Sequence, residues 1–312
     1  MNKRIYWIDW LKVFTMILVV YAHACSNMVV TMIYSFHMPL FFLISGFLHK
    51  PRAFKDELKV TIKSLFIPYF ILTFFFLAIH LDVNYKDYLF TSLCKLEQTP
   101  FFIRPMWFVF SLAIMRIVVS LLRTLNNCIV LSLFCILAFS VGYKLKVIPY
   151  DIDLFQLNTT LLSFPFFILG KYIAQKDVLS KFNKLPLWPI WIICLPVLCL
   201  ALKNGPVNIF RCQCGRFLLL FYFNAVFLSL ATFITFARIK AINQYNYYIE
   251  MTSKSMIILL AYQFTAISLL KIVIDSNTII GSIVVTALVM IIGFFISQFC
   301  WKRLPILFGK KR

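Results

Sequence analysis

The sequence predicts an all-α, polytopic membrane protein, and three observations lead there. The chain of 312 residues is 62% hydrophobic and 13% charged, whereas soluble domains carry about 25% charged residues. Its apolar residues stand in long uninterrupted runs, as in helices that cross a bilayer with about 20 residues each. A membrane β-barrel would instead show alternation over segments of about 10 residues, which this sequence lacks. Because lipid offers the backbone no hydrogen-bond partner, the spans are predicted to be helices.

We expect about ten spans and treat residues 1–312 as one membrane domain, since no loop is long enough for a separate soluble domain. The second span is short, so it is either tilted, partly re-entrant or wrongly bounded. The expected limits are 9–30, 34–49, 61–80, 103–123, 127–145, 157–175, 187–203, 215–237, 254–275 and 278–301.

The distribution of positive charge predicts the orientation of the chain. A net charge of +20 would suggest nucleic acid for a soluble protein. In a membrane protein, Lys and Arg instead hold cytoplasmic loops against an anionic leaflet, so no nucleic-acid partner is expected. With the N-terminus inside, 21 of the 31 Lys and Arg residues fall in inside segments and 9 in outside segments. Both termini are therefore predicted to be cytoplasmic.

The nine cysteines do not predict a disulfide framework, because their number is odd and most lie within apolar runs. Cys212 and Cys214 flank Gln213 at an expected loop–helix junction. Since no His or second Cys pair lies nearby, we interpret them as incidental thiols rather than metal ligands. No metal and no permanently bound cofactor are expected.

The first span contains three ionisable side chains, Asp9, Lys12 and His23. Each costs about 2.5–3.5 kcal/mol on insertion scales and so needs a reason. Lys12 and His23 share a helix face about 16 Å apart, Asp9 can pair with Lys12, and Ser26 and Asn27 extend this polar stripe. We interpret His23, deep in the span, as a general base. A structural histidine, and Asp9 and Lys12 reaching to the interface, are the alternatives.

The second span begins with His37 at its outer end and Pro39 in its first turn, where the missing N–H costs little. Ser45 and Gly46 form a small-residue point that another helix can approach closely. An interfacial histidine with ordinary helix packing also explains these residues.

Two segments together resemble the acyltransferase type 3 family of membrane proteins. They are Phe36-His37-Met38-Pro39-Leu40-Phe41-Phe42 followed by Ile44-Ser45-Gly46-Phe47, and Arg4-Ile5-x-x-Ile8-Asp9-x-Leu11-Lys12 with His23. Family members have a basic residue, ten residues and then a His in the first span, and Lys12 to His23 fits. Weaker matches are Lys59 and Lys63 before Pro68-Tyr69, Pro105-x-Trp107-Phe108-Val109, and Phe166-Phe167-Ile168-Leu169-Gly170-Lys171. The likeness covers essentially the whole chain. In one departure, Tyr262 stands seven residues after Ser255, where members often carry a His.

The resemblance implies an enzyme of the cell inner membrane that transfers an acyl group, most often acetyl, from cytoplasmic acyl-CoA. The acceptor is usually a hydroxyl of a cell-envelope glycan or of its lipid-linked precursor. For this chain we predict catalytic roles for His23 and, next, His37. The predicted donor- and acceptor-binding residues are Asp9, Lys12, Ser45, Lys59, Lys63, Arg104 and Trp107. Of these, Lys12, Lys59 and Lys63 would hold CoA phosphates, while Arg104 and Trp107 would shape the acceptor site.

Two other functions remain open at this point. A transporter or flippase of sugar-linked lipid also needs polar groups at mid-membrane, although the sequence shows neither the internal repeat nor the paired Gly/Pro-broken helices typical of transporters. A structural subunit of a glycan-assembly complex would not need His23. Direct transfer and an acyl-His23 intermediate are both compatible with the sequence, and so are a monomer and a homodimer.

Overall fold

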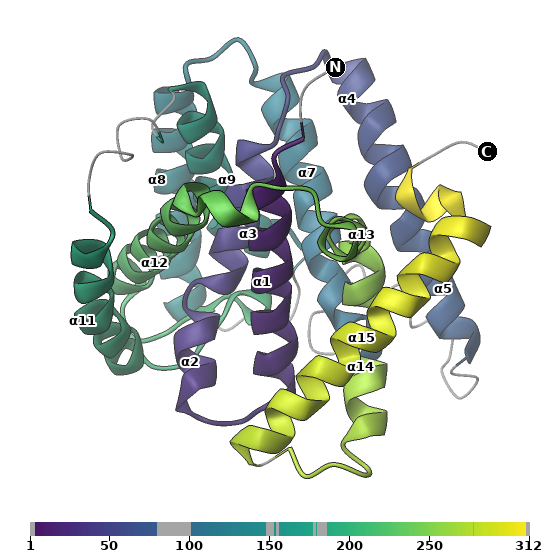
Figure 1. Cartoon of the computed structure of the whole chain (residues 1–312). Coiled ribbons are helices and arrows are strands. Elements are labelled where there is room, and N and C mark those ends of the chain that lie inside the picture. Colours follow the sequence, from purple (N-terminus) through teal and green to yellow (C-terminus); the bar gives the residue numbers. More distant parts are fainter. Residues whose placement is uncertain are drawn as a thin grey trace.

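The structure is a computed structural model that describes residues 4–79, 101–147, 153, 156–176, 179, 186–276 and 278–309. Nearly all of this chain is helical (Figure 1). The longer helices are α1 (Tyr6–Ala24), α2 (Met28–Tyr34), α3 (His37–Phe47), α4 (Phe54–Thr61), α5 (Ile67–Ile79), α7 (Trp107–Leu121), α8 (Asn127–Val147), α9 (Leu157–Gln175), α11 (Trp188–Asn204), α12 (Leu218–Arg238), α13 (Tyr247–Lys254), α14 (Met256–Leu270) and α15 (Ile279–Arg303). The short turns are η1 (Ile62–Phe66), η2 (Phe101–Met106), η4 (Ile209–Arg211), η5 (Lys240–Ile242) and η6 (Pro305–Phe308), and the strands β1 (Val207–Asn208) and β2 (Gln213–Cys214) form an antiparallel pair.

The helices confirm the predicted fold class. Seven segments of the described chain are long and apolar enough to cross a membrane, or eight if the bent α13–α14 pair is one span. The sequence led us to expect about ten. The difference lies in α11, which is 17 residues long, and in α9, whose first turn contains Asn158, Thr159 and Thr160 and is therefore less apolar.

The first expected span, 9–30, is wrongly bounded. Helix α1 ends at Ala24, and Asn27 begins α2 by accepting a hydrogen bond from the Val29 N–H through its side chain. Residues 28–47 then form the second span. Asn27 therefore does not extend the α1 stripe, and His23 lies in the last turn of α1 rather than deep within a span.

The ninth expected span, 254–275, differs as well. The helix of this span, α14, begins at Met256 and ends at Leu270. The residues before it, expected in a loop, form α13, which is bent by 81° relative to α14. The bend is at Ser255, whose hydroxyl donates to the Met251 carbonyl 2.7 Å away. This turn brings α13 against the start of α1 (Figure 1).

Close backbone contact fixes α3 in the bundle. A Cβ on Gly46 would lie 1.8 Å from the Phe167 carbonyl oxygen, and one on Gly170 would lie 2.0 Å from the Leu43 carbonyl oxygen. Only glycine fits at either position, so α3 and α9 lie in direct contact. The predicted close helix approach is confirmed at Gly46, and it sets the position of the helix that begins with His37.

One end of the bundle gathers the start of α1, the α3–α4 loop and the ends of α7, α9 and α15. In Figure 1 this end lies in the upper half of the view, where α1 starts and α15 ends. We call it the basic end, because Arg4, Arg52, Arg123, Lys171 and Lys302 lie there.

Candidate active site

A cavity of about 210 Å³ opens toward the end of the bundle opposite the basic end. The last turn of α1, the α2–α3 segment, the η2–α7 junction and η4 enclose it. Its polar and aromatic lining consists of His23, Tyr34, His37, Arg104, Trp107, Asn208, Phe210, Arg211 and Phe264. Four of the sequence-predicted site residues, His23, His37, Arg104 and Trp107, therefore meet in this one outer cavity.

A second cavity of about 160 Å³ lies farther toward the basic end and contains Lys12 and Ser45 in its lining. Ser253 of α13 joins them, and the remaining walls are apolar. Met38 and Leu260 line both cavities, so this inner cavity adjoins the outer one. Lys12 and His23 thus line two adjoining cavities, as their position on one helix face predicted.

The two histidines of the outer cavity are joined by Tyr34. The Tyr34 hydroxyl lies 3.0 Å from Nδ1 of His23, and its ring packs edge-on against His37 with centroids 5.1 Å apart. The His23 ring also packs against Phe264 of α14, at a centroid distance of 4.5 Å. The sequence gave no reason to single out Tyr34 or Phe264, because both reach His23 from other helices.

His37 is held in one tautomer. Its Nδ1 lies 2.8 Å from the Ile33 carbonyl oxygen, which can only accept, so Nδ1 carries the proton. In the neutral ring, Nε2 is then an acceptor, which is the form a general base needs. His23 differs, because its partner Tyr34 can donate or accept. Nε2 of His23 is free to act as the base in the tautomer in which Nδ1–H donates to the Tyr34 hydroxyl.

The acceptor-binding candidates form a positive and aromatic wall. The guanidinium carbon of Arg104 lies 6.0 Å from the centre of the Phe210 ring, within the range of a cation–π contact. Trp107 packs against the same ring at 6.2 Å, and Arg211 completes this side of the cavity. No Asp or Glu of the described chain lines the outer cavity, so the wall suits a ligand with polar or anionic groups.

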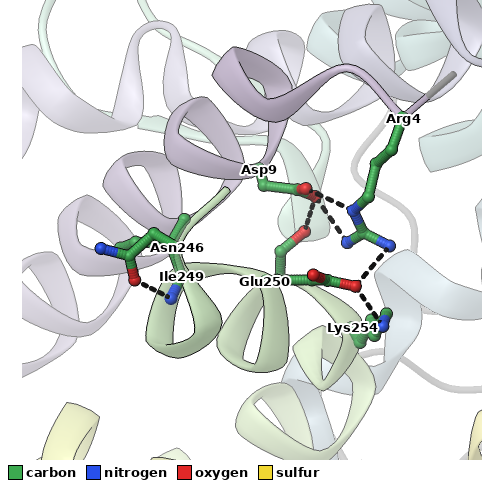
Figure 2. A network of polar contacts seen from close by, with 7 residues as sticks. Arg4, Asp9, Asn246, Ile249, Glu250 and Lys254 are labelled. Atoms are coloured by element: carbon green, nitrogen blue, oxygen red, sulfur yellow. Dashed lines mark hydrogen bonds and ion pairs between the residues drawn. The ribbon is translucent and has the colours of Figure 1, made fainter. Parts of the chain in front are cut away.

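Asp9 has a different partner from the one that the sequence suggested. Its carboxylate accepts from Arg4 Nε at 2.7 Å and from the Ser253 hydroxyl at 2.6 Å, while Arg4 also contacts Glu250 at 3.3 Å. Figure 2 shows this network, which Lys254 completes by pairing with Glu250. Asp9 therefore fastens α1 to α13, next to the inner cavity, and Lys12 lines the cavity itself.

The predicted phosphate-binding residues Lys59 and Lys63 lie elsewhere. Both are exposed on the α4–η1 surface, and neither lines the inner or the outer cavity. Their neighbour Glu57 is fully buried and pairs with Arg52 at 3.0 Å and with Arg116 at 2.7 Å. The sequence does not single out this cluster, because Asp56 and Glu57 are adjacent acids and only the structure shows that Glu57 is the buried one.

Tyr262 does not replace the late histidine of the family in the cavity. Its hydroxyl donates to the Val289 carbonyl of α15, and a Cβ on Gly293 would lie 2.2 Å from this hydroxyl oxygen. Tyr262 thus packs between α14 and α15, while Phe264 faces His23.

The two thiols of the β1–β2 hairpin, Cys212 and Cys214, are buried and form no disulfide. Burial raises the pKa of Cys214 to about 12, so this thiol stays protonated. Among the residues that the structure describes, no group of three His, Cys, Asp or Glu is close enough to hold a metal.

Comparison with known proteins identifies one family. A family model described as an acyltransferase domain, Acyl_transf_3, matches residues 5–302. The match includes both cavities and every predicted site residue. No curated protein and no solved structure matches the chain.

Proposed function

Because the chain belongs to the acyltransferase type 3 family, we propose that it moves an acetyl group from acetyl-CoA to a hydroxyl of a cell-surface polysaccharide or its lipid-linked precursor. The observation that carries this proposal is the pair of adjoining cavities between Lys12 and His23. The inner cavity is the smaller one and is mostly apolar, as suits a pantetheine arm. The outer cavity is larger and has more polar side chains in its lining, as suits a sugar acceptor.

The proposal places the basic end in the cytoplasm, with the protein in the cell inner membrane and both termini inside. The positive-inside rule supports this orientation, and a soluble acyl-CoA would then enter past Lys12. A fusion of a reporter to the C-terminus should therefore report a cytoplasmic location.

In the proposed reaction, the acceptor hydroxyl gives its proton to a neutral ring nitrogen of His23 as its oxygen attacks the thioester carbonyl. The tetrahedral intermediate then collapses, the carbon–sulfur bond breaks, and the CoA thiolate leaves and takes up the proton held by His23. Tyr34 fixes the orientation of the His23 ring, and His37 is the second base candidate. Arg104 and Trp107 hold the acceptor.

Lys12 would bind the donor in this scheme. The Lys12→Ala variant should lose affinity for acetyl-CoA while its thermal unfolding temperature stays close to that of the wild type. Unchanged donor affinity in the purified variant would remove Lys12 from the donor site.

One observation favours the transporter alternative, since α13 and α14 form a broken helix beside the inner cavity, a feature found at transporter binding sites. Reconstitution separates the two functions. Purified protein in liposomes receives acetyl-labelled acetyl-CoA, and the lipid-linked glycans are examined for gain of label. Label on the glycan supports transferase activity, whereas movement of unlabelled glycan across the bilayer without acetylation supports transport.

A further inference from the structure

A third cavity, of about 320 Å³, lies at the basic end between the α3–α4 loop, the α7–α8 turn and the end of α9. Its polar lining includes His49, Arg52, Arg123, Asn127, Lys171 and Lys176, and none of its lining residues is acidic. It shares no lining residue with the inner or outer cavity. The acyl-transfer site described above does not account for it.

The charges around this basic cavity are not balanced. Arg52 is neutralised by Glu57, 3.0 Å away, and Glu57 is shared with Arg116 behind it. Arg123, Lys171 and Lys176 have no ion pair within the described parts of the chain. Three positive charges therefore face one hollow without a counter-charge.

Lys171 distinguishes this cavity from an ordinary basic surface. Its residue is only 6% exposed, and no hydrogen bond or ion pair with another described residue satisfies its ammonium group. Lysines that only orient a membrane protein remain in water, as Lys55 on α4 does. Because Lys171 lines the cavity with little access to bulk water and no counter-charge, its ammonium group is poorly solvated there, and an anion in the cavity would offset that cost.

We propose that the basic cavity binds the phosphate group of an anionic ligand. Arg123 can hold a phosphate through two parallel N–H donors, and Lys171 and Lys176 add point charges. The volume is at the lower end of the range of small-ligand sites, about 300–1,000 Å³. Two sources offer this chemistry at a cytoplasmic membrane surface: the headgroup of an anionic lipid, or the nucleotide phosphates of a CoA-type ligand. The second source rests on the proposed function.

Each source has its own probe. Adenosine 3′,5′-bisphosphate carries nucleotide phosphates without a thioester, so its binding does not depend on acyl transfer. Phosphatidylglycerol and phosphatidylcholine, offered in equal amounts in mixed micelles, compare an anionic with a zwitterionic lipid by native mass spectrometry. The variants are Lys171→Met, which keeps length and removes charge, Lys171→Arg, which keeps charge, and Lys55→Met as the exposed control.

We expect Lys171→Met to bind one probe at least tenfold more weakly than the wild type, while Lys171→Arg and Lys55→Met keep most of their affinity. Loss of bisphosphate binding assigns the nucleotide, and loss of the preference for phosphatidylglycerol assigns the lipid. Arg123→Gln, at an exposed position, gives the same readout if Lys171→Met does not fold. Wild-type protein that binds neither probe, or variants that bind both as the wild type does, would overturn the proposal. A protein that shows no acetyl transfer but still binds a probe through Lys171 would contradict only the proposed transferase function and would leave the anion site in place.

Discussion

The outer cavity and the Glu57 cluster are both polar regions within an apolar bundle, yet they satisfy their polar groups in opposite ways. Glu57 is fully buried and pairs with two arginines, so its negative charge is neutralised within the protein. His23 and His37 are held by uncharged partners, a tyrosine hydroxyl and a backbone carbonyl. Each of these rings has two nitrogens, and the described contacts engage only one of them.

This difference indicates which region does chemistry. A buried charge that is matched within the protein has no capacity left for a ligand, and its removal leaves an uncompensated partner. A neutral imidazole oriented through one nitrogen keeps the other for proton transfer. We therefore assign catalysis to the histidines and a structural role to Glu57, and the following predictions test that division.

The largest effect is expected at His23. Loss of a general base typically costs about 100- to 10,000-fold in rate, so His23→Ala and His23→Gln should both lose acetylation while they accumulate and unfold like the wild type. Glutamine keeps hydrogen-bonding ability but cannot take up a proton at neutral pH. The measurement is acetyl transfer by purified protein in liposomes.

Near-normal transfer by a well-folded His23→Gln variant would contradict this assignment. His37→Gln made in parallel then decides the alternative, since the Nε2 of His37 is also available. Loss of activity in His37→Gln alone would move the base to His37.

Glu57→Gln should have the opposite signature. Two guanidinium groups would face a neutral amide, and breaking a buried ion pair in this way costs about 3–5 kcal/mol. We expect a much lower thermal unfolding temperature, with acetyl transfer per folded molecule unchanged, because Glu57 lines neither cavity of the transfer site.

The double variant Glu57→Gln with Arg116→Met is the control. By removing one unpaired cation, it should recover part of the lost stability. A stable but inactive Glu57→Gln protein would show that the cluster takes part in the reaction and that the division is wrong.

The sequence predicted the bundle well, because long apolar runs leave few alternatives in lipid. It extended the first span past the end of α1, because Met28–Tyr34 is as apolar as α1 and only the capping residue Asn27 signals the break between α1 and α2. It also missed α13, whose polar residues are typical of a loop. The spacing of Lys12 and His23 correctly predicted that both residues lie on one helix face, along which the two adjoining cavities are arranged. Tyr34 contacts His23 from another helix, and local sequence spacing does not reveal such a contact.

A smaller effect is expected at Tyr34. Tyr34→Phe removes the hydrogen bond to His23 and little else, because the ring stays. The bond should contribute about 1.4 kcal/mol or less, so kcat should fall by up to about tenfold. The KM for acetyl-CoA should not change, since Tyr34 does not line the inner cavity. A variant with unchanged kcat would show that Tyr34 does not orient His23 for catalysis.

The smallest effect concerns His49, which follows α3 and lies beside the Glu57 cluster. The pKa of His49 is lowered to about 4, chiefly by burial; Glu57 opposes this shift, and the cations Arg116, Lys171 and Arg52 add to it. The unfolded chain has a histidine pKa of about 6.5. As the pH falls below that value, the unfolded state binds a proton at His49 that the folded state does not bind, so the free energy of unfolding falls until about pH 4.

The His49→Gln substitution removes this contribution of His49 to the pH dependence of stability. The wild type should therefore lose stability relative to the variant between pH 6.5 and pH 4.5, by at most ~1.4 kcal/mol per pH unit. Thermal unfolding of both proteins across this range measures the difference. Parallel curves would mean that His49 titrates normally and that the cations beside it are screened, which would weaken the contrast between the Glu57 charge cluster and the neutral histidines of the outer cavity.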